Sequence, residues 1–308
     1  MIKDAIYISH LTKEYGQKSQ PSSSKLALNE LNLVIPKGTI FGLLGPNGAG
    51  KSTLINILAG TVMKTSGEVF IEGVSIDESP KQARSLIGIV PQEITFDTFF
   101  PLYQALEFYA GYYGVRPEQR KTEEILKALS LWDKRKNFPQ QLSGGMKRRF
   151  LIAKAMVHSP KVLVLDEPTA GVDLELRSQL WSYVRELNKQ GITIIITTHY
   201  LAEAQELCNE IAFINKGKII KQASKSDLLA EFGTRHVDVE FNEQVTFYDN
   251  KSDLIEVIDK NKIRFQIDTA KGNYSQILKE IDKIGVGIKD LRVSEPDLED
   301  IFYHIMSR

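Results

Sequence analysis

The sequence predicts an α/β fold with a mostly parallel sheet, an antiparallel β subdomain and a helical insertion, followed by a small C-terminal α+β domain. Two apolar runs rich in β-branched residues, KVLVLDE at 161–167 and GITIIITTH at 191–199, are separated by the amphipathic segment LELRSQLWSYVRELNKQ. Buried strands that alternate with helices are typical of a parallel sheet covered on both faces. After about residue 225 the composition becomes more polar, which indicates a second domain.

The N-terminal part contains the first strands and a glycine-rich loop. Short alternating strands are expected around residues 5–9, 31–35 and 39–44, and a helix is expected to begin near Lys51. The serine-rich stretch QKSQPSSSK at 17–25 predicts a solvated surface loop.

A helical block is predicted from about residue 91 to 160, and it completes a first domain of residues 1–225. Its segments YQALEFYAGYYG, EEILKALSLWDK and LSGGMKRRFLIAKAMVHS have helical patterns. The second domain, residues 226–308, combines the strand patterns HVDVEF and IRFQI with the helical patterns YSQILKEIDKIG and LEDIFYHIM.

Composition excludes several classes of protein. The 39 basic and 39 acidic side chains cancel, which argues against a protein that binds nucleic acid over its whole surface. The single cysteine, Cys208, permits no internal disulfide and is expected to pack in the core of a protein from a reducing compartment. No window has the roughly 18 apolar residues of a membrane-spanning helix, so a partner would have to supply any membrane spans.

The glycine loop predicts a phosphate site. Gly45, Gly50, Lys51 and Ser52 fit G-x-x-x-x-G-K-[ST] directly after the apolar strand TIFGLL, as in a P-loop NTPase core. Glycines let the backbone amides turn toward phosphate oxygens, and the dipole of the following helix adds to the attraction. Lys51 is expected to reach the β- and γ-phosphates, and the Ser52 hydroxyl to bind magnesium.

Two carboxylates and a histidine follow the buried strands. Asp166 and Glu167 end VLVLDE at the sheet edge where parallel sheets bind ligands. Asp166 is suited to hold magnesium through water, and Glu167 to polarise the water that attacks the γ-phosphate. His199 ends ITIIITTH and could orient that water, although a histidine at a strand end is more often solvated or structural.

Together these segments resemble the ATP-binding cassette (ABC) family, the ATPase subunits of transporters. The resemblance covers about residues 1–225 and includes GPNGAGKST, IGIVPQE, LSGGM, VLVLDEP, AGVD and TTHYLAEA, in family order. It implies ATP and Mg²⁺ as cofactors, Gln92 near the metal and the attacking water, and Tyr15 stacked on adenine. For Tyr15 the alternative is a half-exposed aromatic residue on a strand.

The resemblance thus assigns three sets of site residues. The catalytic residues would be Glu167, His199 and Gln92, and the metal-binding residues Ser52, Gln92 and Asp166. The residues in contact with nucleotide would be Tyr15, Gly45, Pro46, Asn47, Gly48, Ala49, Gly50, Lys51, Ser52, Thr53, Ser143, Gly144, Gly145 and Asp173.

The stretch LSGGMKRR at 142–149 is a second candidate anion site. Ser143 is a natural N-cap, and the two glycines leave backbone amides accessible at the start of a helix. The resemblance implies that two copies face each other head to tail, so that this signature of one chain closes over the γ-phosphate held by the other. Met146 stands where the family usually has glutamine. The basic residues at 147–149 are interpreted as a solvated face or as support next to the phosphate.

The signature variant and the closing segment VSEPDLEDIFYHIM resemble the drug-exporter-type branch of the family. This branch implies a separate membrane permease, a position on the cytoplasmic face of the membrane and no nucleic-acid partner. The aromatic residues of DTFFPLYQALEFYAGYYG either line a groove for the permease or belong to the core.

The alternative function is that of a soluble ABC ATPase not tied to transport, and a GTPase is a third interpretation. A soluble ABC ATPase that acts on ribosomes generally carries two cassettes, and the DNA-repair kind needs long heptad arms, whereas this chain has one phosphate loop and no such arms. A GTPase would need Asn-Lys-x-Asp in the domain of the phosphate loop. The Asn-Lys pairs at 188, 215 and 261 lack the aspartate, and the match NKSD at 250–253 lies in the predicted second domain.

Overall fold

The computed structural model describes residues 3–16, 25–95, 98–169, 174–198, 200–232, 235–245, 255–267, 274–294 and 298–306. The chain divides into two compact units, residues 1–224 and 225–308, each of which is described by itself. The expected polar loop at 17–25 lies outside the described residues except for Lys25, which begins a strand.

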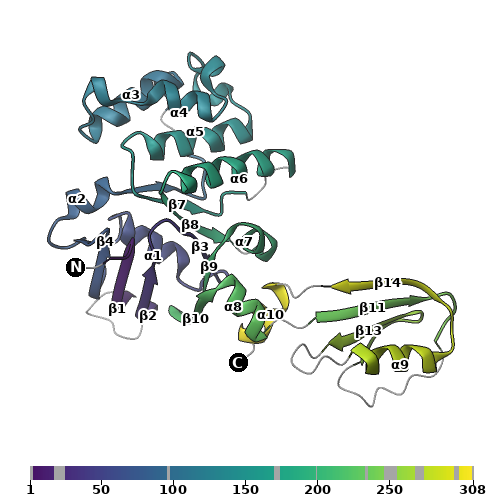
Figure 1. The fold of residues 1–308 in the computed structure, drawn as a ribbon. Helices are drawn as coiled ribbons and strands as arrows, with labels where there is room; N and C mark the ends of the chain where they lie inside the picture. Colours follow the sequence, from purple (N-terminus) through teal and green to yellow (C-terminus); the bar gives the residue numbers. More distant parts are fainter. Residues whose placement is uncertain are drawn as a thin grey trace. The chain divides into compact units, whose positions relative to one another are not determined.

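A mostly parallel sheet forms the centre of the first unit, as the sequence predicts (Figure 1). Its strands, in spatial order, are β10 (Lys218–Ser224), β9 (Glu210–Asn215), β3 (Ile40–Leu44), β8 (Thr193–Thr198), β7 (Val162–Asp166) and β6 (Ile87–Val90). Only the pairing of β10 with β9 is antiparallel in this sheet. The parallel register brings the carboxyl ends of β3, β7 and β8 to one edge, where ligands bind in such sheets.

An antiparallel sheet lies beside the central one. Its strands are β2 (Lys25–Ile35), β1 (Ile6–Tyr15), β4 (Ser66–Ile71) and β5 (Val74–Ser75). Helix α1 (Lys51–Leu58) joins the two sheets into one core, because its buried side chains pack with strand residues of both. This shared core holds the loop between β3 and α1 from two sides.

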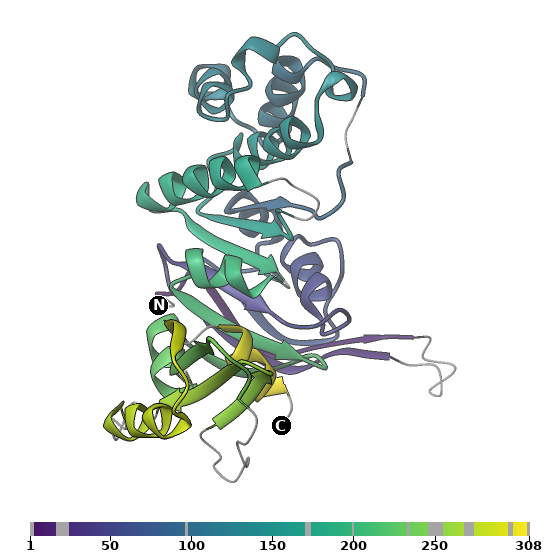
Figure 2. The ribbon, with the colours of Figure 1, turned by 90° about the vertical axis from the view of Figure 1, so that its right-hand side faces the viewer.

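Helices make up the remainder of the first unit, and Figures 1 and 2 place α3 and α4 at the end away from the antiparallel sheet. The helices are α2 (Pro80–Ser85), α3 (Leu102–Tyr112), α4 (Thr122–Ala128), α5 (Gly144–Met156), α6 (Leu174–Lys189) and α7 (Leu201–Leu207). Short 3-10 turns η2 (Pro117–Gln119), η3 (Trp132–Lys134) and η4 (Pro139–Gln141) lie between them. Cys208, directly after α7, is buried, as expected.

The second unit has its own core. Its antiparallel sheet has the order β12 (Ile255–Asp259), β13 (Lys262–Ile267), β11 (Arg235–Phe241) and β14 (Ile288–Ser294). Apolar residues of β11 and β13 pack with Ile277 and Ile281 of α9 (Tyr274–Ile284). Helices α8 (Lys225–Phe232) and α10 (Leu298–Met306) contact each other. None of the helices in the described ranges of either unit is both long and apolar enough to cross a membrane.

Candidate nucleotide site

The phosphate loop leaves β3 and enters α1 through positions that require glycine. A Cβ atom on Gly45 would lie 2.2 Å from the backbone oxygen of Ile214 on β9. Gly50 has a φ of +114°, and a Cβ there would lie 2.8 Å from the oxygen of Ala27 on β2. The loop is therefore held against strands of both sheets at these two points, and its backbone conformation is fixed.

Lys51 lies inside this loop. Its side chain is only 6% exposed, and its Nζ donates to the carbonyl oxygens of Gly45 at 2.6 Å and Pro46 at 3.1 Å. Burial lowers the pKa of the ammonium from its ordinary value, while the nearby charges of Glu167 and Asp166 oppose this shift. The loop thus holds a cation at its centre that is poorly hydrated and available to an anionic ligand.

Asp166 and Glu167 stand at the carboxyl end of β7. Asp166 accepts a hydrogen bond from Thr197 Oγ1 on the adjacent strand β8 at 2.5 Å. Burial raises the pKa of Asp166, and the hydrogen bond from Thr197 partly offsets that effect. The backbone N–H of Glu167 donates to the Thr197 carbonyl at 3.1 Å. Thr197, which the sequence analysis did not single out, therefore holds both acidic residues.

Gln92 and Glu167 are in direct contact. Gln92 Nε2 donates to Glu167 Oε2 at 2.8 Å, although 75 residues separate the two in the sequence. Glu167 has a φ of 45°, a left-handed backbone conformation that is unfavourable for a residue other than glycine. Such strain is typical of functional sites, where the surrounding structure maintains it.

The other residues predicted to contact nucleotide fall into three groups. Pro46, Asn47, Gly48 and Ser52 are exposed along the phosphate loop, Thr53 is half-buried and Ala49 is buried. Tyr15, at the end of β1, is 39% exposed, and Lys13 Nζ lies 4.7 Å from the centre of its ring. His199 and Asp173 lie outside the described residues. The roles of all these residues stay predictions.

The signature begins α5 in the way that its sequence predicts. Ser143 is the N-cap residue, and its hydroxyl accepts from the backbone N–H of Met146 at 3.4 Å. Gly144 is exposed, and a Cβ placed on it would meet nothing within 4 Å. The first turn of α5 therefore has its Met146 amide capped by Ser143 and begins at an exposed glycine with open space beside it.

The interpretation of the basic cluster as a solvated face is wrong for Arg148, which is 5% exposed and points into the protein. Its guanidinium donates to five backbone carbonyls, those of Pro91 (2.8 Å), Gln92 (2.9 Å), Asp166 (2.8 Å), Glu167 (2.5 Å) and Pro168 (2.9 Å). Residue spacing could have indicated this, because positions 148, 152 and 155 share one helix face and Ile152 and Ala155 are buried.

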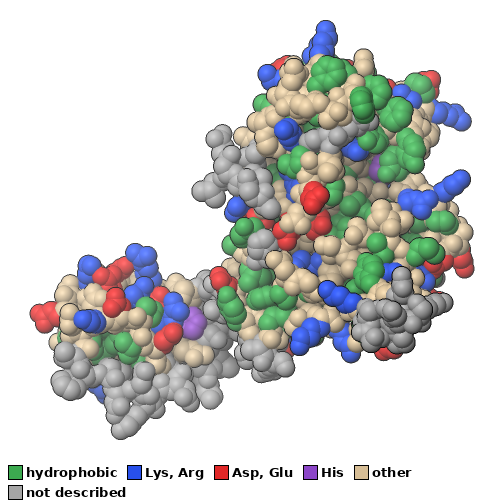
Figure 3. Space-filling model, turned by 180° about the vertical axis from the view of Figure 1, so that it is seen from behind, with side chains coloured by type: hydrophobic (Ala, Val, Ile, Leu, Met, Phe, Trp, Pro, Cys, Tyr) green, Lys and Arg blue, Asp and Glu red, His purple; other side chains and the backbone are tan. Residues whose placement is uncertain are grey.

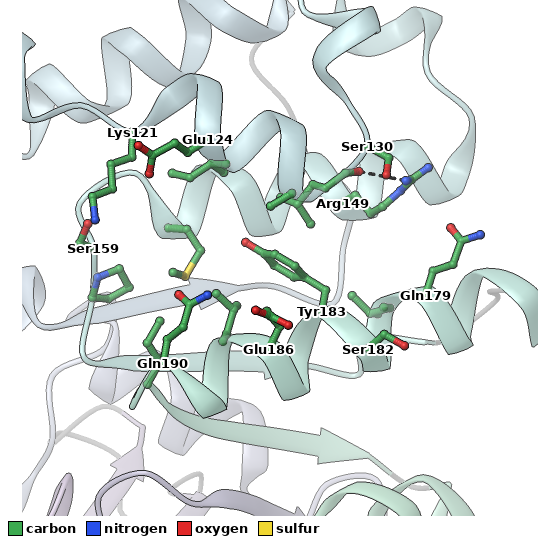
Figure 4. Close-up of a pocket in the computed structure, with 18 of the residues that line it drawn as sticks. Lys121, Glu124, Ser130, Arg149, Ser159, Gln179, Ser182, Tyr183, Glu186 and Gln190 are labelled. Atoms are coloured by element: carbon green, nitrogen blue, oxygen red, sulfur yellow. Dashed lines mark hydrogen bonds between the residues drawn. The ribbon is translucent and has the colours of Figure 1, made fainter.

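Arg149 points elsewhere, toward a cavity of about 1040 Å³ between α4, α5 and α6 (Figure 4). Its Nη1 donates to the carbonyl of Leu129 at 2.9 Å. Burial raises the pKa of Tyr183, another residue that lines this cavity, to about 12. None of the described residues that we expect to contact nucleotide lines the cavity. Arg149 therefore lies at the cavity, whereas Arg148 lies behind the candidate nucleotide site.

Aromatic side chains are exposed on the helical part of the first unit, where hydrophobic side chains gather in Figure 3. Phe99 is 81%, Phe108 57% and Tyr112 80% exposed, whereas the residues that α3 buries are Leu102, Ala105, Leu106 and Ala110. The interpretation of these three aromatics as core residues is therefore wrong.

Comparisons with known proteins agree with the motifs and the fold. A model of the ABC transporter family matches residues 28–170. The linearmycin resistance ATP-binding protein LnrL of Bacillus subtilis (strain 168) is 31% identical over 314 residues, 97% of this chain and 97% of LnrL. The chain belongs to the ABC transporter ATP-binding proteins. A Nod factor export ATP-binding protein I of Rhizobium sp. (strain N33) is 32% identical over 100% of this chain and 99% of its own length.

Solved structures of the ABC family share the fold of the first unit. The cassette MJ0796, in a dimeric post-hydrolysis state bound to ADP and Pi, has a TM-score of 0.63 and 27% identity over 71% of this chain and 98% of its own. This ABC protein is thus the ATP-binding subunit of a transporter and an ATPase that converts ATP to ADP and phosphate. The resemblance to the drug-exporter-type branch is confirmed, because the relatives carry resistance and export names.

Proposed function

We propose that this ABC ATPase works as a head-to-tail pair of identical chains that drives export through a separate membrane permease. The observation that carries the proposal is the meeting, at one sheet edge, of the buried Lys51 with Asp166, Glu167 and Gln92. In this assignment residues 1–225 form the ATPase domain, and residues 226–308 form an accessory domain.

The phosphate loop would hold the triphosphate. Lys51 Nζ exchanges its bonds to the carbonyls of Gly45 and Pro46 for phosphate oxygens, and the free amides of the first turn of α1 add further donors. Tyr15 stacks on adenine, which suits its exposed position at the end of β1. ATP is the nucleotide that family membership supports.

The oxygen atoms of Ser52, Gln92 and Asp166 fit Mg²⁺, because hydroxyl, amide and carboxylate oxygens are the ligands that this hard cation prefers. Ser52 is exposed at the start of α1. Asp166 is the last residue of β7, a strand that contacts α1. When bound, Mg²⁺ neutralises part of the phosphate charge. Glu167 accepts a proton from the attacking water, and Gln92 orients its carboxylate through their hydrogen bond.

The second copy supplies the signature. The Ser143 cap and the exposed Gly144 suit the γ-phosphate of ATP that is bound to the neighbouring chain, and the amide of Gly145 would add a donor. The dimeric state of the MJ0796 cassette supports a paired arrangement. With ATP between the chains, binding favours association and hydrolysis favours separation.

The permease would dock on the exposed aromatic face of α3 and place the pair on the cytoplasmic side of the membrane. Exposed Phe108 and Tyr112 support this site, because apolar surface of this kind marks interaction faces. The names of relatives, resistance to linearmycin and daunorubicin and export of Nod factor, support an antibiotic or a Nod-factor-like molecule as the exported substrate.

A trapped dimer tests this function. Glu167→Gln keeps the size of the side chain and its contact with Gln92 but removes the base, so ATP should bind and not be hydrolysed. We expect turnover to fall about a hundredfold or more, and a dimer to appear in size-exclusion chromatography with ATP and magnesium but not with ADP. Glu93→Gln, at an exposed position near Gln92, is the control and should remain an active ATPase. Full turnover by a Glu167→Gln monomer would refute the proposal.

A further inference from the structure

Arg148 occupies an unusual position within the signature helix. It follows the exposed residues Ser143 and Gly144 by about one helical turn, yet its guanidinium is buried and bonded to five backbone carbonyls at distances of 2.5–2.9 Å. A guanidinium has five N–H donors in a rigid plane, and here all three nitrogens are engaged. No lysine could reproduce this pattern, because an ammonium has three donors at one point.

The five carbonyls belong to two segments that bear the proposed catalytic groups of the same chain. Nη1 bridges the oxygens of Pro91 and Gln92, and Nε and Nη2 bond to the backbone at 166–168. These are the segments whose side chains meet in the Gln92–Glu167 hydrogen bond. Arg148 therefore fixes from behind the two main chains on which that side-chain contact depends.

The backbone at Glu167 needs such support. Its φ of 45° is unfavourable for a side chain with a Cβ, and Arg148 bonds to the carbonyls of Glu167 and both its neighbours. The carboxylates of Asp166 and Glu167 also act on the guanidinium and oppose the lowering of its pKa by burial. The charge and the hydrogen bonds thus act together on one strained turn.

We propose that Arg148 is a positioning residue for Gln92 and Glu167 of its own chain, although it lies in the segment whose first turn serves the neighbouring chain. The inference rests on the proposed roles of those two residues and of the shared site. Loss of Arg148 should slow hydrolysis without weakening ATP binding, because the described contacts of Arg148 include no residue of the phosphate loop.

Mixed dimers can separate the two sides of the shared site. A Lys51→Ala chain paired with a Ser143→Arg chain has one working site, made of the phosphate loop and catalytic groups of the Ser143→Arg chain and the signature of the other. Arg148→Gln is then added either to the Ser143→Arg chain, on the side of the catalytic groups, or to the Lys51→Ala chain, on the side of the signature.

The inference predicts an asymmetric result. On the catalytic side Arg148→Gln should lower kcat about tenfold or more, because small displacements of reacting groups have large effects on rate. On the signature side the loss should stay within about threefold. The KM for ATP should change little in both mixed dimers. Equal losses on the two sides, or a larger loss on the signature side, would overturn the inference.

Single variants keep the inference testable if the mixed dimers fail. If the Lys51→Ala and Ser143→Arg mixed dimer is inactive before Arg148 is changed, this result would count against the shared site. Arg148 variants would then be tested in dimers of two identical chains. There kcat should decrease from wild type to Arg148→Lys to Arg148→Gln with KM unchanged. Arg149→Gln removes a charge from the adjacent position, where the guanidinium donates to the carbonyl of Leu129. The melting temperature of Arg149→Gln should be close to that of Arg148→Gln. The loss of kcat should be smaller in Arg149→Gln than in Arg148→Gln. A wild-type kcat in Arg148→Gln would refute the inference.

Discussion

The burial of Lys51 disfavours its charged form in the folded protein, but it places the ammonium where the phosphates of ATP would bind. Among the described residues, its buried ammonium donates to the neutral carbonyls of Gly45 and Pro46, and burial lowers its pKa. Lys51→Ala should therefore lower ATP affinity about a hundredfold, while the free energy of unfolding changes by less than about 1 kcal/mol. Fluorescent-nucleotide titration and urea unfolding measure the two effects. Lys189→Ala, at an exposed position of α6, is the control, and equal ATP affinity in both variants would contradict the assignment.

The phosphate loop and the acidic pair could be predicted from the sequence because each is a local pattern, a glycine loop or a strand end with two carboxylates. The Gln92–Glu167 contact could not, since the two residues are 75 positions apart and are brought together by the pairing of β6 with β7. The position of Arg148 depends on the same pairing, because its carbonyl partners come from the ends of both strands.

Among the elements, the packing of α5 against β6 depends on Gly88. A Cβ at this position would lie 2.4 Å from the carbonyl oxygen of Ala155 on α5. Gly88→Ala should push the helix from the sheet and destabilise the protein by about 1–3 kcal/mol. It should also lower kcat, because displacement of α5 draws Arg148 away from Gln92.

Gly144→Ala, on the same helix, is the matched control for stability. A Cβ at Gly144 meets nothing within 4 Å, so its free energy of unfolding should stay within about 0.5 kcal/mol of wild type. Chemical denaturation of both variants makes the comparison. Equal stability of the two variants would show that α5 can move without cost.

Strand prediction in the second unit succeeded where one face is buried. β11 and β13 alternate buried and half-buried residues, and the sequence patterns HVDVEF and IRFQI show this alternation. The strands β12 and β14 are not predicted, because all their side chains are exposed or half-buried and no buried apolar face marks them. These strands form because β12 pairs with β13 and β14 pairs with β11. The residue pattern of one segment does not predict such pairing.

At the scale of the whole molecule, the two units have separate cores, and every described residue of the candidate nucleotide site lies in the first. Removal of residues 225–308 from the Glu167→Gln chain should leave ATP affinity within about twofold of the intact chain, because the two units have separate cores and we expect them to contribute independently. The measurement is nucleotide titration followed by size-exclusion chromatography with ATP and magnesium.

Phe265→Ala gives an independent test in the intact chain. Phe265 is buried in the core of the second unit, and its truncation should destabilise that unit by about 3–5 kcal/mol. If the units are energetically separate, ATP affinity should remain at the wild-type level while the unfolding of the second unit shifts to a lower temperature. Loss of ATP binding in both the truncated chain and Phe265→Ala would show that the second unit supports the nucleotide site. Loss of only the ATP-trapped dimer would instead assign the second unit to the pairing of the two chains.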